Sequence, residues 1–287
     1  MTIDRVVDAH VHLWDPARAD WYPFLSPEGG RALNMGDTSR MSRRFDQTTY
    51  FDESKRWNVE KFVHVAAAAP PHGVEETMEL DEQADGSGHP DAIIGGLLLA
   101  EAFGDAGTQL DAHSASPRFR GVRIMGEGSS AIPTPAVISA LHERDLVLDL
   151  MVHPDGLEDA ARALAGTDLR VVVEHTGWPR TNTPEEYELW KAGMEMLAGL
   201  RENVSCKLSG LAMPLQSMDA SVLRPWVEHS IETFGVDRCM FASNFPVDGN
   251  HGTYDDLYGA YDELTSGLGA ADREKLFASN AEKMYRC

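Results

Sequence analysis

The chain has 287 residues, 43% of them hydrophobic, which is enough to bury one large core in a single domain. Its 46 acidic residues exceed its 25 lysines and arginines, and the formal charge of −21 disfavours a nucleic-acid partner because phosphate backbones would be repelled. The sequence has no apolar run of about 18 residues, and it begins with acidic residues and histidines where a signal peptide would be apolar. We therefore expect a cytoplasmic protein that contacts neither nucleic acid nor membrane.

Eight short apolar runs recur along the chain, and each has the length of a β-strand. They are residues 5–13, 61–67, 92–100, 119–125, 146–153, 170–177, 204–211 and 239–246. Most are apolar on both faces, as the strands of a buried parallel sheet are. Helical spacing fills the intervals at residues 74–84, 134–144, 157–165, 184–200, 221–234 and 254–267, and a last helix follows at 270–285. This alternation predicts an α/β fold, a single-domain (β/α)₈ TIM barrel over residues 1–287 with a C-terminal helix that covers the barrel.

The long connection after the first strand is an exception, because residues 14–58 show little regular patterning. A connection of that length inside a compact domain is usually functional or disordered. Its aromatic residues argue against disorder, since they would be costly to leave in water: Trp14, Trp21, Tyr22, Phe24, Phe45, Tyr50 and Phe51. We interpret this segment as a partly ordered active-site loop. The alternative is a structural flap that seals the barrel against a neighbour.

Active sites of such barrels lie at the carboxyl ends of the strands, so the polar residues there are the candidates. The first run contains Asp8, His10 and His12, and the alternation of a strand turns both histidines to one face, where they can reach one ion or one substrate. The ends of later runs add Glu101, Arg123, His153, His175, Lys207 and Asn244. Any one of them could be a satisfied polar group, and the two histidines could be a core pair. Their arrival together at one end of the barrel favours a catalytic site.

The histidines indicate a metal site, because neutral imidazoles suit a borderline divalent ion such as Zn²⁺. His10 and His12 are the first candidate ligands. His175 would complete the metal site or orient a water molecule, and His153 is a second candidate for that role.

Five segments carry a resemblance to a known family. They are DAHVHLWDP (8–16), GVR (121–123), EHTGWP (174–179), KLSGL (207–211) and FASNFP (241–246). Together they look like the amidohydrolase-related lactonases of the amidohydrolase superfamily, a group with sugar lactonases for fuconolactone or rhamnonolactone and with pyrone-dicarboxylate and sulfomuconolactone lactonases. The likeness spans essentially the whole chain, from Asp8 to about Val247. It implies that water opens the ring of a small-molecule lactone; some members bind zinc at the two histidines, and others need no metal.

The last strand departs from that family's pattern. Its motif usually reads Ser-Asp-Trp-Pro, whereas this chain has Asn244 in place of the aspartate. That aspartate is the family's usual general base, and an amide cannot take a proton at neutral pH. Asn244 could still coordinate a metal or hold a water. The base would then be one of four other groups: Asp248, Glu101, His153 or His175.

The sixth strand carries a second departure, since Trp178 stands where the family usually has lysine. An apolar wall in place of a cation suggests a less anionic substrate, aromatic or bulkier than the family's usual ones. Arg123 offers a fixed fork of donors for a carboxylate or carbonyl oxygen, and Lys207 could bind a carboxylate or ring oxygen. Whether Lys207 is free or paired with a carboxylate such as Glu174 is left open by the sequence.

We expect a hydrolase that opens a lactone or a similar cyclic ester. The catalytic candidates are His10, His12, His175, Asn244 and Asp248, and the metal candidates are His10, His12 and His175 for Zn²⁺ or another divalent ion, with a metal-independent mechanism as the alternative. The substrate-binding candidates are Arg123, Lys207, His153, Glu101, Trp178 and Trp14. Two other functions stay open: a metal-dependent non-oxidative decarboxylase of an aromatic or unsaturated acid, and a catalytically silent small-molecule binder. The sequence also leaves a homo-oligomer open.

Overall fold

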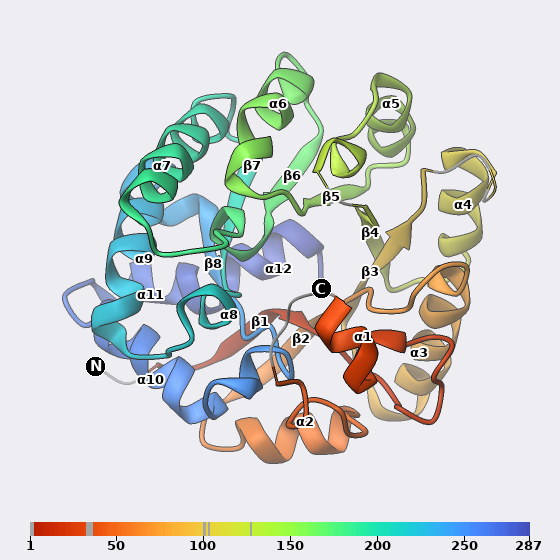
Figure 1. The fold of residues 1–287 in the computed structure, drawn as a ribbon, viewed down its shortest axis with the longest axis horizontal. Helices are drawn as coiled ribbons and strands as arrows, with labels where there is room; N and C mark the ends of the chain where they lie inside the picture. The colour runs from red at the N-terminus through yellow and green to blue at the C-terminus, as the bar shows by residue number, and fades with distance from the viewer. Residues whose placement is uncertain (1–2, 33–36, 100–101, 103, 127) are drawn as a thin grey trace.

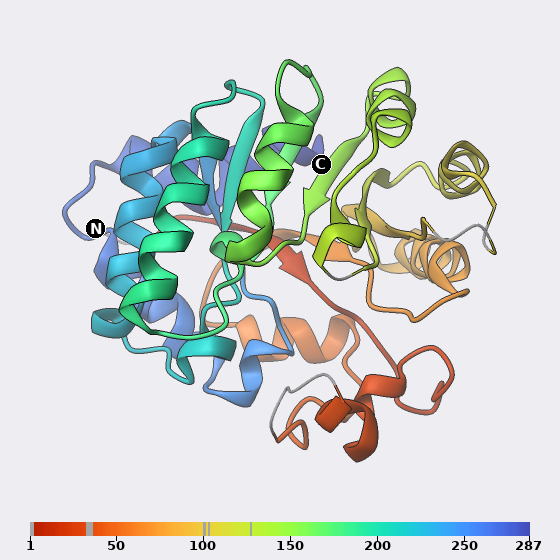
Figure 2. The ribbon, with the colours of Figure 1, turned by 45° about the horizontal axis from the view of Figure 1, so that its top comes forward.

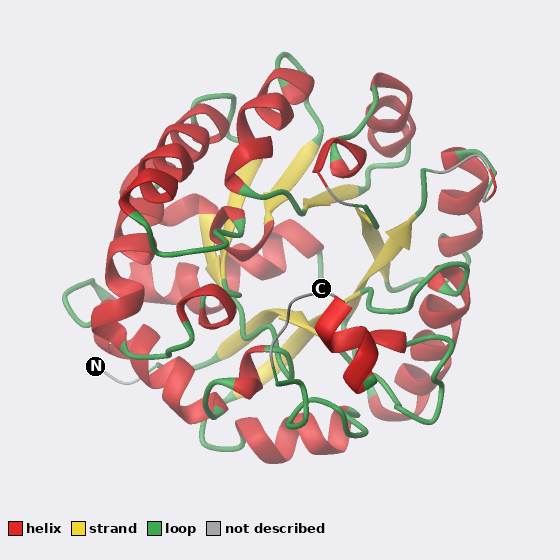
Figure 3. Cartoon of the chain, in the orientation of Figure 1, coloured by secondary structure: helices red, strands yellow, loops and turns green. Residues whose placement is uncertain are grey.

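The structure is a computed structural model that describes residues 3–32, 37–99, 102, 104–126 and 128–287. Its centre is one sheet of eight parallel strands whose spatial order follows the sequence. The strands are β1 (Val6–Val11), β2 (Val59–Val65), β3 (Ala92–Leu97), β4 (Phe119–Ile124), β5 (Val147–Leu150), β6 (Arg170–Val173), β7 (Val204–Leu208) and β8 (Cys239–Phe241). Figure 3 shows these strands enclosed by a ring of helices.

Backbone contacts just after β8 join the last strand to the first. Val11 and Phe245 form a parallel bridge, Asn244 N donates to His10 O over 2.9 Å, and His12 N donates to Phe245 O over 2.8 Å. The sheet is thereby closed, and the predicted (β/α)₈ barrel is confirmed. Each predicted apolar run overlaps one strand, and only β2 begins before its run. Every strand ends before its run does, because the last residues of the run leave the sheet to form the barrel mouth.

The helices that follow the strands match most of the predicted intervals. They are α3 (Gly73–Ser87), α4 (Ala106–His113), α5 (Pro135–Glu143), α6 (Pro154–Leu164), α7 (Pro184–Ala198), α8 (Ala212–Leu215), α9 (Ala220–Phe234) and α10 (Tyr254–Leu264), with 3₁₀ turns at η3 (Gly128–Ala131), η4 (Glu174–Gly177), η5 (Val236–Arg238) and η6 (Asp248–Asn250). Thr134 and Thr183 cap α5 and α7 through their hydroxyls, each followed by proline. Helix α4 was not predicted, because only Leu110 and His113 of its residues are buried and they give no helical stripe.

The connection between β1 and β2 contains η1 (Pro23–Leu25), α1 (Pro27–Ala32) and α2 (Gln47–Ser54), so it has more regular structure than its pattern predicted. Trp14 pairs with Phe45 in an isolated antiparallel bridge. The Asp46 side chain caps α2 by accepting from Thr49 N. Figure 2 shows this segment extending beyond the carboxyl end of β1.

The C-terminal segment is α11 (Ala270–Glu274), a π-helical turn η7 (Lys275–Ser279) and α12 (Asn280–Tyr285) in place of one continuous helix. Ala278, Ala281 and Tyr285 are buried together with barrel-interior residues such as Val7 and Val147. In Figure 1, α12 lies behind the strands and α1 lies in front of them, so the two segments cover opposite ends of the barrel. Among the described residues, no helix is both long and apolar enough to cross a bilayer.

Candidate active site

His10 and His12 lie side by side at the carboxyl end of β1, as predicted. Their Nε2 atoms are 3.1 Å apart. The ring N–H at His12 Nδ1 donates to Val65 O over 2.8 Å, which leaves His12 Nε2 with its lone pair. The two Nε2 atoms therefore share either one proton or one cation. Two nitrogens bound to one tetrahedral Zn²⁺ would be about 3.3 Å apart, so the pair has the spacing of metal ligands.

Asp8 holds this pair in place from behind. One carboxylate oxygen accepts from Ser243 N over 2.8 Å and from His10 N over 3.3 Å, which ties β1 to the chain after β8. The other accepts the hydroxyls of Tyr50 and Tyr254, at 2.8 and 3.1 Å. Asp8 is fully buried and has donors on both oxygens, so it serves as an anchor rather than a reacting group.

His175 reaches the same centre because the backbone turns sharply after β6. His175, Thr176 and Trp178 have φ of 50°, 56° and 42°. Left-handed residues other than glycine cost about 1–2 kcal/mol each and mark functional sites when the surroundings hold them. Trp190 Nε1 donates to Thr176 O over 2.6 Å, and Gly210 leaves room for the turned ring, since a Cβ at 210 would lie 2.5 Å from His175 Nδ1. The His175 and His10 ring centroids are 4.5 Å apart.

Glu174 brings a carboxylate to the histidines, and the sequence prediction had not placed it among the metal ligands. Its oxygens lie 3.7 Å from His10 Nδ1 and 3.9 Å from His175 Nε2, and neither has a hydrogen-bond donor. Burial raises the pKa of Glu174 to about 7, although the nearby Arg123 guanidinium opposes the rise. Its position in the sequence, directly before His175 at the end of a strand, was the feature that could have identified it as a ligand.

This set of residues fits a divalent cation. His10, Glu174 and His175 each offer a ligand atom within 4.8 Å of the others. Burial, with Lys207 and Arg123 close by, holds the pKa values of His10 and His175 well below the usual range, so both rings are neutral as metal ligation requires. Buried acceptor oxygens without donors need an explanation, and a metal ion beside neutral imidazoles supplies one.

The two basic residues of the mouth have different positions. Arg123 Nη2 donates to Ala66 O, and its Nη1 lies 3.5 Å from Glu174 Oε2, with the side chain slightly exposed at the site. Lys207 is fully buried and donates to Asp149 Oδ2 over 2.6 Å; its Nζ is 3.4 Å from His10 Nδ1. We expected Lys207 to face the substrate. It lies behind His10 instead, because Asp149 provides a counter-charge inside the barrel.

Asp149 was missed by the sequence prediction, although a charged residue in the apolar run LVLDL was a visible signal. It also accepts the hydroxyl of Tyr285 over 2.9 Å, which links the C-terminal helix α12 to the base of the site. Removing either Asp149 or Lys207 would leave the other as an unpaired buried charge, which is costly. The two residues therefore act as one pair, and its ammonium group lies beside His10.

After β8, Asn244 and Asp248 form a second polar unit. Asn244 has a φ of 55°, which asparagine tolerates better than most residues. Its Nδ2 donates to Asp248 Oδ1 over 2.9 Å, while Asp248 Oδ2 is buried and has no partner. Burial raises the pKa of Asp248 to about 7. A carboxylate with that pKa is half ionised near neutral pH, which suits a proton acceptor.

Two tryptophans flank the histidines. The Trp14 ring stacks on His12 with centroids 5.8 Å apart, and its Nε1 donates to Met41 O in the first connection. Trp178 stacks on His153 at 4.2 Å, and the His153 Nδ1 N–H donates to Trp178 O over 2.8 Å. Trp14 and the three clustered histidines are almost fully buried, whereas His153 and Trp178 are partly exposed.

The predicted candidate Glu101 lies outside the described residues.

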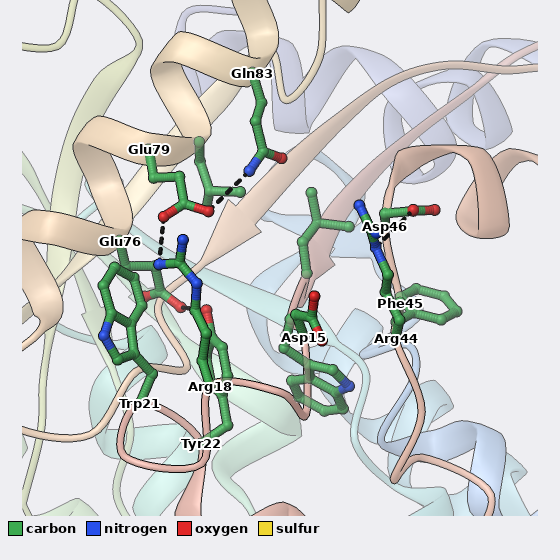
Figure 4. Close-up of a pocket in the computed structure, with 13 residues that line it drawn as sticks. Asp15, Arg18, Trp21, Tyr22, Arg44, Phe45, Asp46, Glu76, Glu79 and Gln83 are labelled. Carbon is green, nitrogen blue, oxygen red and sulfur yellow. Dashed lines mark hydrogen bonds and ion pairs between the residues drawn. The ribbon is translucent and has the colours of Figure 1, made fainter.

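A cavity of about 270 Å³ lies on the far side of Trp14, between the first connection and α3. Figure 4 shows Arg18 and Trp21 from the connection facing Glu79 and Gln83 from the helix. The histidines of the barrel mouth do not line it. Trp14, which stacks on His12, is among the residues that line it, so the cavity adjoins the site through this side chain.

The amidohydrolase family matches residues 7–287 of this chain. The chain belongs to the amidohydrolase family. Its relatives include an uncharacterized protein of Sinorhizobium fredii, 32% identical with 98% of both chains covered. An L-fucono-1,5-lactonase of Burkholderia multivorans is 28% identical over 160 residues, which covers 52% of this chain and 54% of the lactonase. An amidohydrolase structure of Burkholderia multivorans with bound zinc has a TM-score of 0.81 at 24% identity and covers 98% of this chain and 99% of its own, which shows the shared fold.

Within this amidohydrolase, the structure brings most of the predicted residues to one mouth. The three histidines converge, with Arg123 beside them and Trp178 at the edge. Lys207 is withdrawn beneath the site. Glu174 and Asp149 are the additions that sequence patterns did not give. Folding thus brings together a set of candidate metal ligands and the buried charges that help to keep the histidines neutral.

Proposed function

We propose that this amidohydrolase opens a lactone or a similar cyclic ester by attack of water on the ring carbonyl. The observation that carries the proposal is the convergence of neutral imidazoles on the donor-free carboxylate of Glu174, with the guanidinium of Arg123 3.5 Å away. A site of this kind can polarise a carbonyl oxygen while excluding bulk water. The likeness to an L-fucono-1,5-lactonase supports the same reaction class.

His10, His175 and Glu174 are the residues that would hold a divalent ion, and His12, whose Nε2 lies 3.1 Å from His10 Nε2, is a further candidate ligand. Zn²⁺ or a similar cation would act there as a Lewis acid on the carbonyl and make water more acidic. Trp14 covers one face of His12, and the Val65 carbonyl fixes its tautomer. These two contacts hold the His12 lone pair toward His10, which is how the chain prepares the site before any ligand arrives.

Arg123 would bind the carbonyl oxygen and stabilise the negative charge that forms on it. Its Nη2 is fixed on Ala66 O, so the fork stays oriented without rearrangement during the reaction. Asp248 would take the proton from the attacking water at Oδ2, while the Asn244 amide holds Oδ1. When the ring C–O bond breaks, Asp248 would return that proton to the leaving oxygen. The product is a hydroxy acid, and one proton is released to solvent as its carboxyl group ionises.

The test is proton release from a panel of sugar, aromatic and dicarboxylate lactones, with and without a chelator. We expect hydrolysis by the wild type and a loss of at least about a thousandfold in His10→Ala and His12→Ala, because each removes a polarising ligand. Circular dichroism of both variants controls for folding. Unchanged hydrolysis in these variants would contradict the proposal.

The same panel separates the other two functions. Release of CO₂ from an aromatic or unsaturated acid, without lactone hydrolysis, would assign the site to decarboxylation. Ligand binding without turnover would assign it to a silent binder. Hydrolysis that survives the chelator would leave Arg123 as the polarising group and exclude a required metal.

A further inference from the structure

The exposed edge of the active site is aromatic. Trp178 and His153 stack at 4.2 Å with an interplanar angle of 27°, and we call this pair the aromatic shelf. Trp178 also meets His175 edge-on at 5.9 Å, so the shelf begins directly beside the histidine centre. His10, His12 and His175 are buried, whereas both members of the shelf are partly exposed. A ligand that approaches the histidines on this side therefore passes over the shelf.

The backbone fixes the shelf in position. Trp178 has a φ of 42°, and its carbonyl accepts the His153 Nδ1 N–H over 2.8 Å. The ring orientation therefore follows from the same left-handed turn that places His175. Met151, two residues before His153 in the chain, has its Sδ 3.7 Å from Arg123 Nη1, and a thioether is a soft partner for a flat ring.

The charges near the shelf leave little to bind an anionic substituent. In the described parts of the eight strand ends, the cations are Arg123 and Lys207. Lys207 is fully buried on Asp149, and Arg123 is turned toward Glu174 and Ala66 O. Farther out, Arg180 pairs with Asp155 at 3.1 Å. Of these cations, Arg123 is thus the one positioned to contact a substrate, and the proposed reaction already uses it to bind the carbonyl oxygen of the cyclic ester.

We propose that the substrate is a flat, uncharged ring system fused or joined to the cyclic ester, such as an aryl lactone, and that Trp178 determines this specificity by stacking on the flat ring. The inference rests on the proposed hydrolase function for the reacting carbonyl. A puckered sugar ring would offer C–H groups to the indole in place of a flat π face, and a dicarboxylate would lack a second cation at the described strand ends. Stacking between aromatic rings requires two flat faces at a suitable offset, so the flatness of the ligand is the property to test.

The first experiment measures binding without chemistry. β-Tetralone is the ketone analogue of dihydrocoumarin and cannot be hydrolysed, and β-decalone has the same bicyclic skeleton without a flat ring. Equilibrium titration of the whole protein should give tighter binding of β-tetralone, on the order of fivefold, because stacking favours the flat ring. The more hydrophobic β-decalone would bind more tightly if apolar contact alone mattered.

Two substitutions of Trp178 provide matched controls. Trp178→Phe keeps a flat ring, and Trp178→Leu keeps an apolar side chain without one. Both residues, like tryptophan, are unbranched at Cβ, and circular dichroism of each variant controls for folding. We expect Trp178→Phe to retain the preference for β-tetralone and Trp178→Leu to lose it. Equal binding of the two ketones by the wild type, or a preference unchanged in Trp178→Leu, would overturn the inference.

The second experiment compares hydrolysis of three lactones. Dihydrocoumarin is neutral with a flat ring, a sugar lactone is neutral and puckered, and pyrone-dicarboxylate is flat and doubly charged. We expect the highest kcat/KM for dihydrocoumarin, and in Trp178→Leu a rise of its KM of about fivefold with little change in kcat, because stacking is the same in ground and transition states. A preference for either other lactone would overturn the inference and leave the hydrolase proposal standing. Turnover of none, with the ketone preference intact, would overturn the hydrolase proposal and uphold the role of Trp178 in ring binding.

Discussion

Glu174, after β6, and Asp248, after β8, are both fully buried carboxylates, and burial raises the pKa of each to about 7. Their neighbours differ. Glu174 has His10, His175 and Arg123 within 4 Å and no hydrogen-bond donor on either oxygen. Asp248 has the Asn244 amide on Oδ1 and no side-chain donor on Oδ2, and backbone hydrogen bonds from Ala212 and Gly210 also lower its pKa. Equal burial thus gives two different groups: Glu174 is surrounded as a cation ligand would be, and Asp248 as a proton acceptor would be.

The largest effect should come from Asp248→Asn. The substitution keeps the shape of the side chain and removes its ability to take a proton, so kcat should fall by about a thousandfold, within the range that general bases contribute. Because the Asp248 side chain is hydrogen-bonded to Asn244 and not to His10, His12 or His175, bound metal should be unchanged. Metal content by emission spectroscopy and steady-state kinetics on one preparation check both points. A wild-type kcat would show that the proton goes elsewhere.

Glu174→Gln should have the second largest effect. Replacing the carboxylate with an amide removes a charged ligand beside the imidazoles. Metal affinity should therefore fall by at least about a hundredfold, because even the loss of an outer partner of a metal site costs about 10–100-fold. Competition with a chelating dye measures the affinity directly. Activity should return at high metal concentration. An affinity equal to that of the wild type would place the cation away from Glu174.

The pH dependence of kcat distinguishes the carboxylates more finely. If Asp248 accepts the proton, kcat should rise about tenfold per pH unit below pH 7 and level off above it, because the ionised form is the active one. The Asn244 amide lowers the pKa of Asp248 by donating to Oδ1, so Asn244→Ala should move the midpoint to higher pH. A stopped-flow pH profile of both proteins tests this, and a midpoint that does not move would separate Asn244 from the base.

The smallest effect concerns stability in metal-free protein. Folding raises the pKa of Glu174 from 4.5 and of Asp248 from 3.8, each to about 7. Between about pH 4 and 7 the unfolded chain therefore binds fewer protons at these two groups, and their contribution to the free energy of unfolding falls as pH rises. The buried histidines, whose pKa values are lowered, act in the opposite direction. The difference in Tm between Glu174→Gln and the wild type should accordingly be more favourable to the variant at pH 8 than at pH 5.

Calorimetry in a chelator at the two pH values measures this difference. If the Tm of Glu174→Gln differs from that of the wild type by the same amount at pH 5 and pH 8, Glu174 is ionised in the folded protein with no penalty. Asp248→Asn provides the parallel comparison. Burial raises the pKa of Asp248, and among side chains only Asn244, through its hydrogen bond, opposes the rise.

The sequence predicted the barrel because its strands are apolar on both faces and its strand ends are polar. The two histidines of β1 and the guanidinium of Arg123 follow from local alternation and could be placed without the structure. Glu174 could not be placed in this way, because its role depends on the left-handed turn at His175, and hydrophobic periodicity does not predict such a turn. The withdrawal of Lys207 likewise depends on Asp149, a partner 58 residues away in the chain. Long-range charge pairing and backbone strain are the parts of the site that local patterns do not contain.

The most direct test of the division between the two carboxylates is to measure bound metal and lactone hydrolysis together in Asp248→Asn and Glu174→Gln. We predict that Asp248→Asn holds metal as the wild type does and hydrolyses lactones about a thousandfold more slowly, and that Glu174→Gln loses metal and regains hydrolysis when metal is supplied in excess. Loss of metal in both variants, or wild-type hydrolysis by Asp248→Asn, would contradict it.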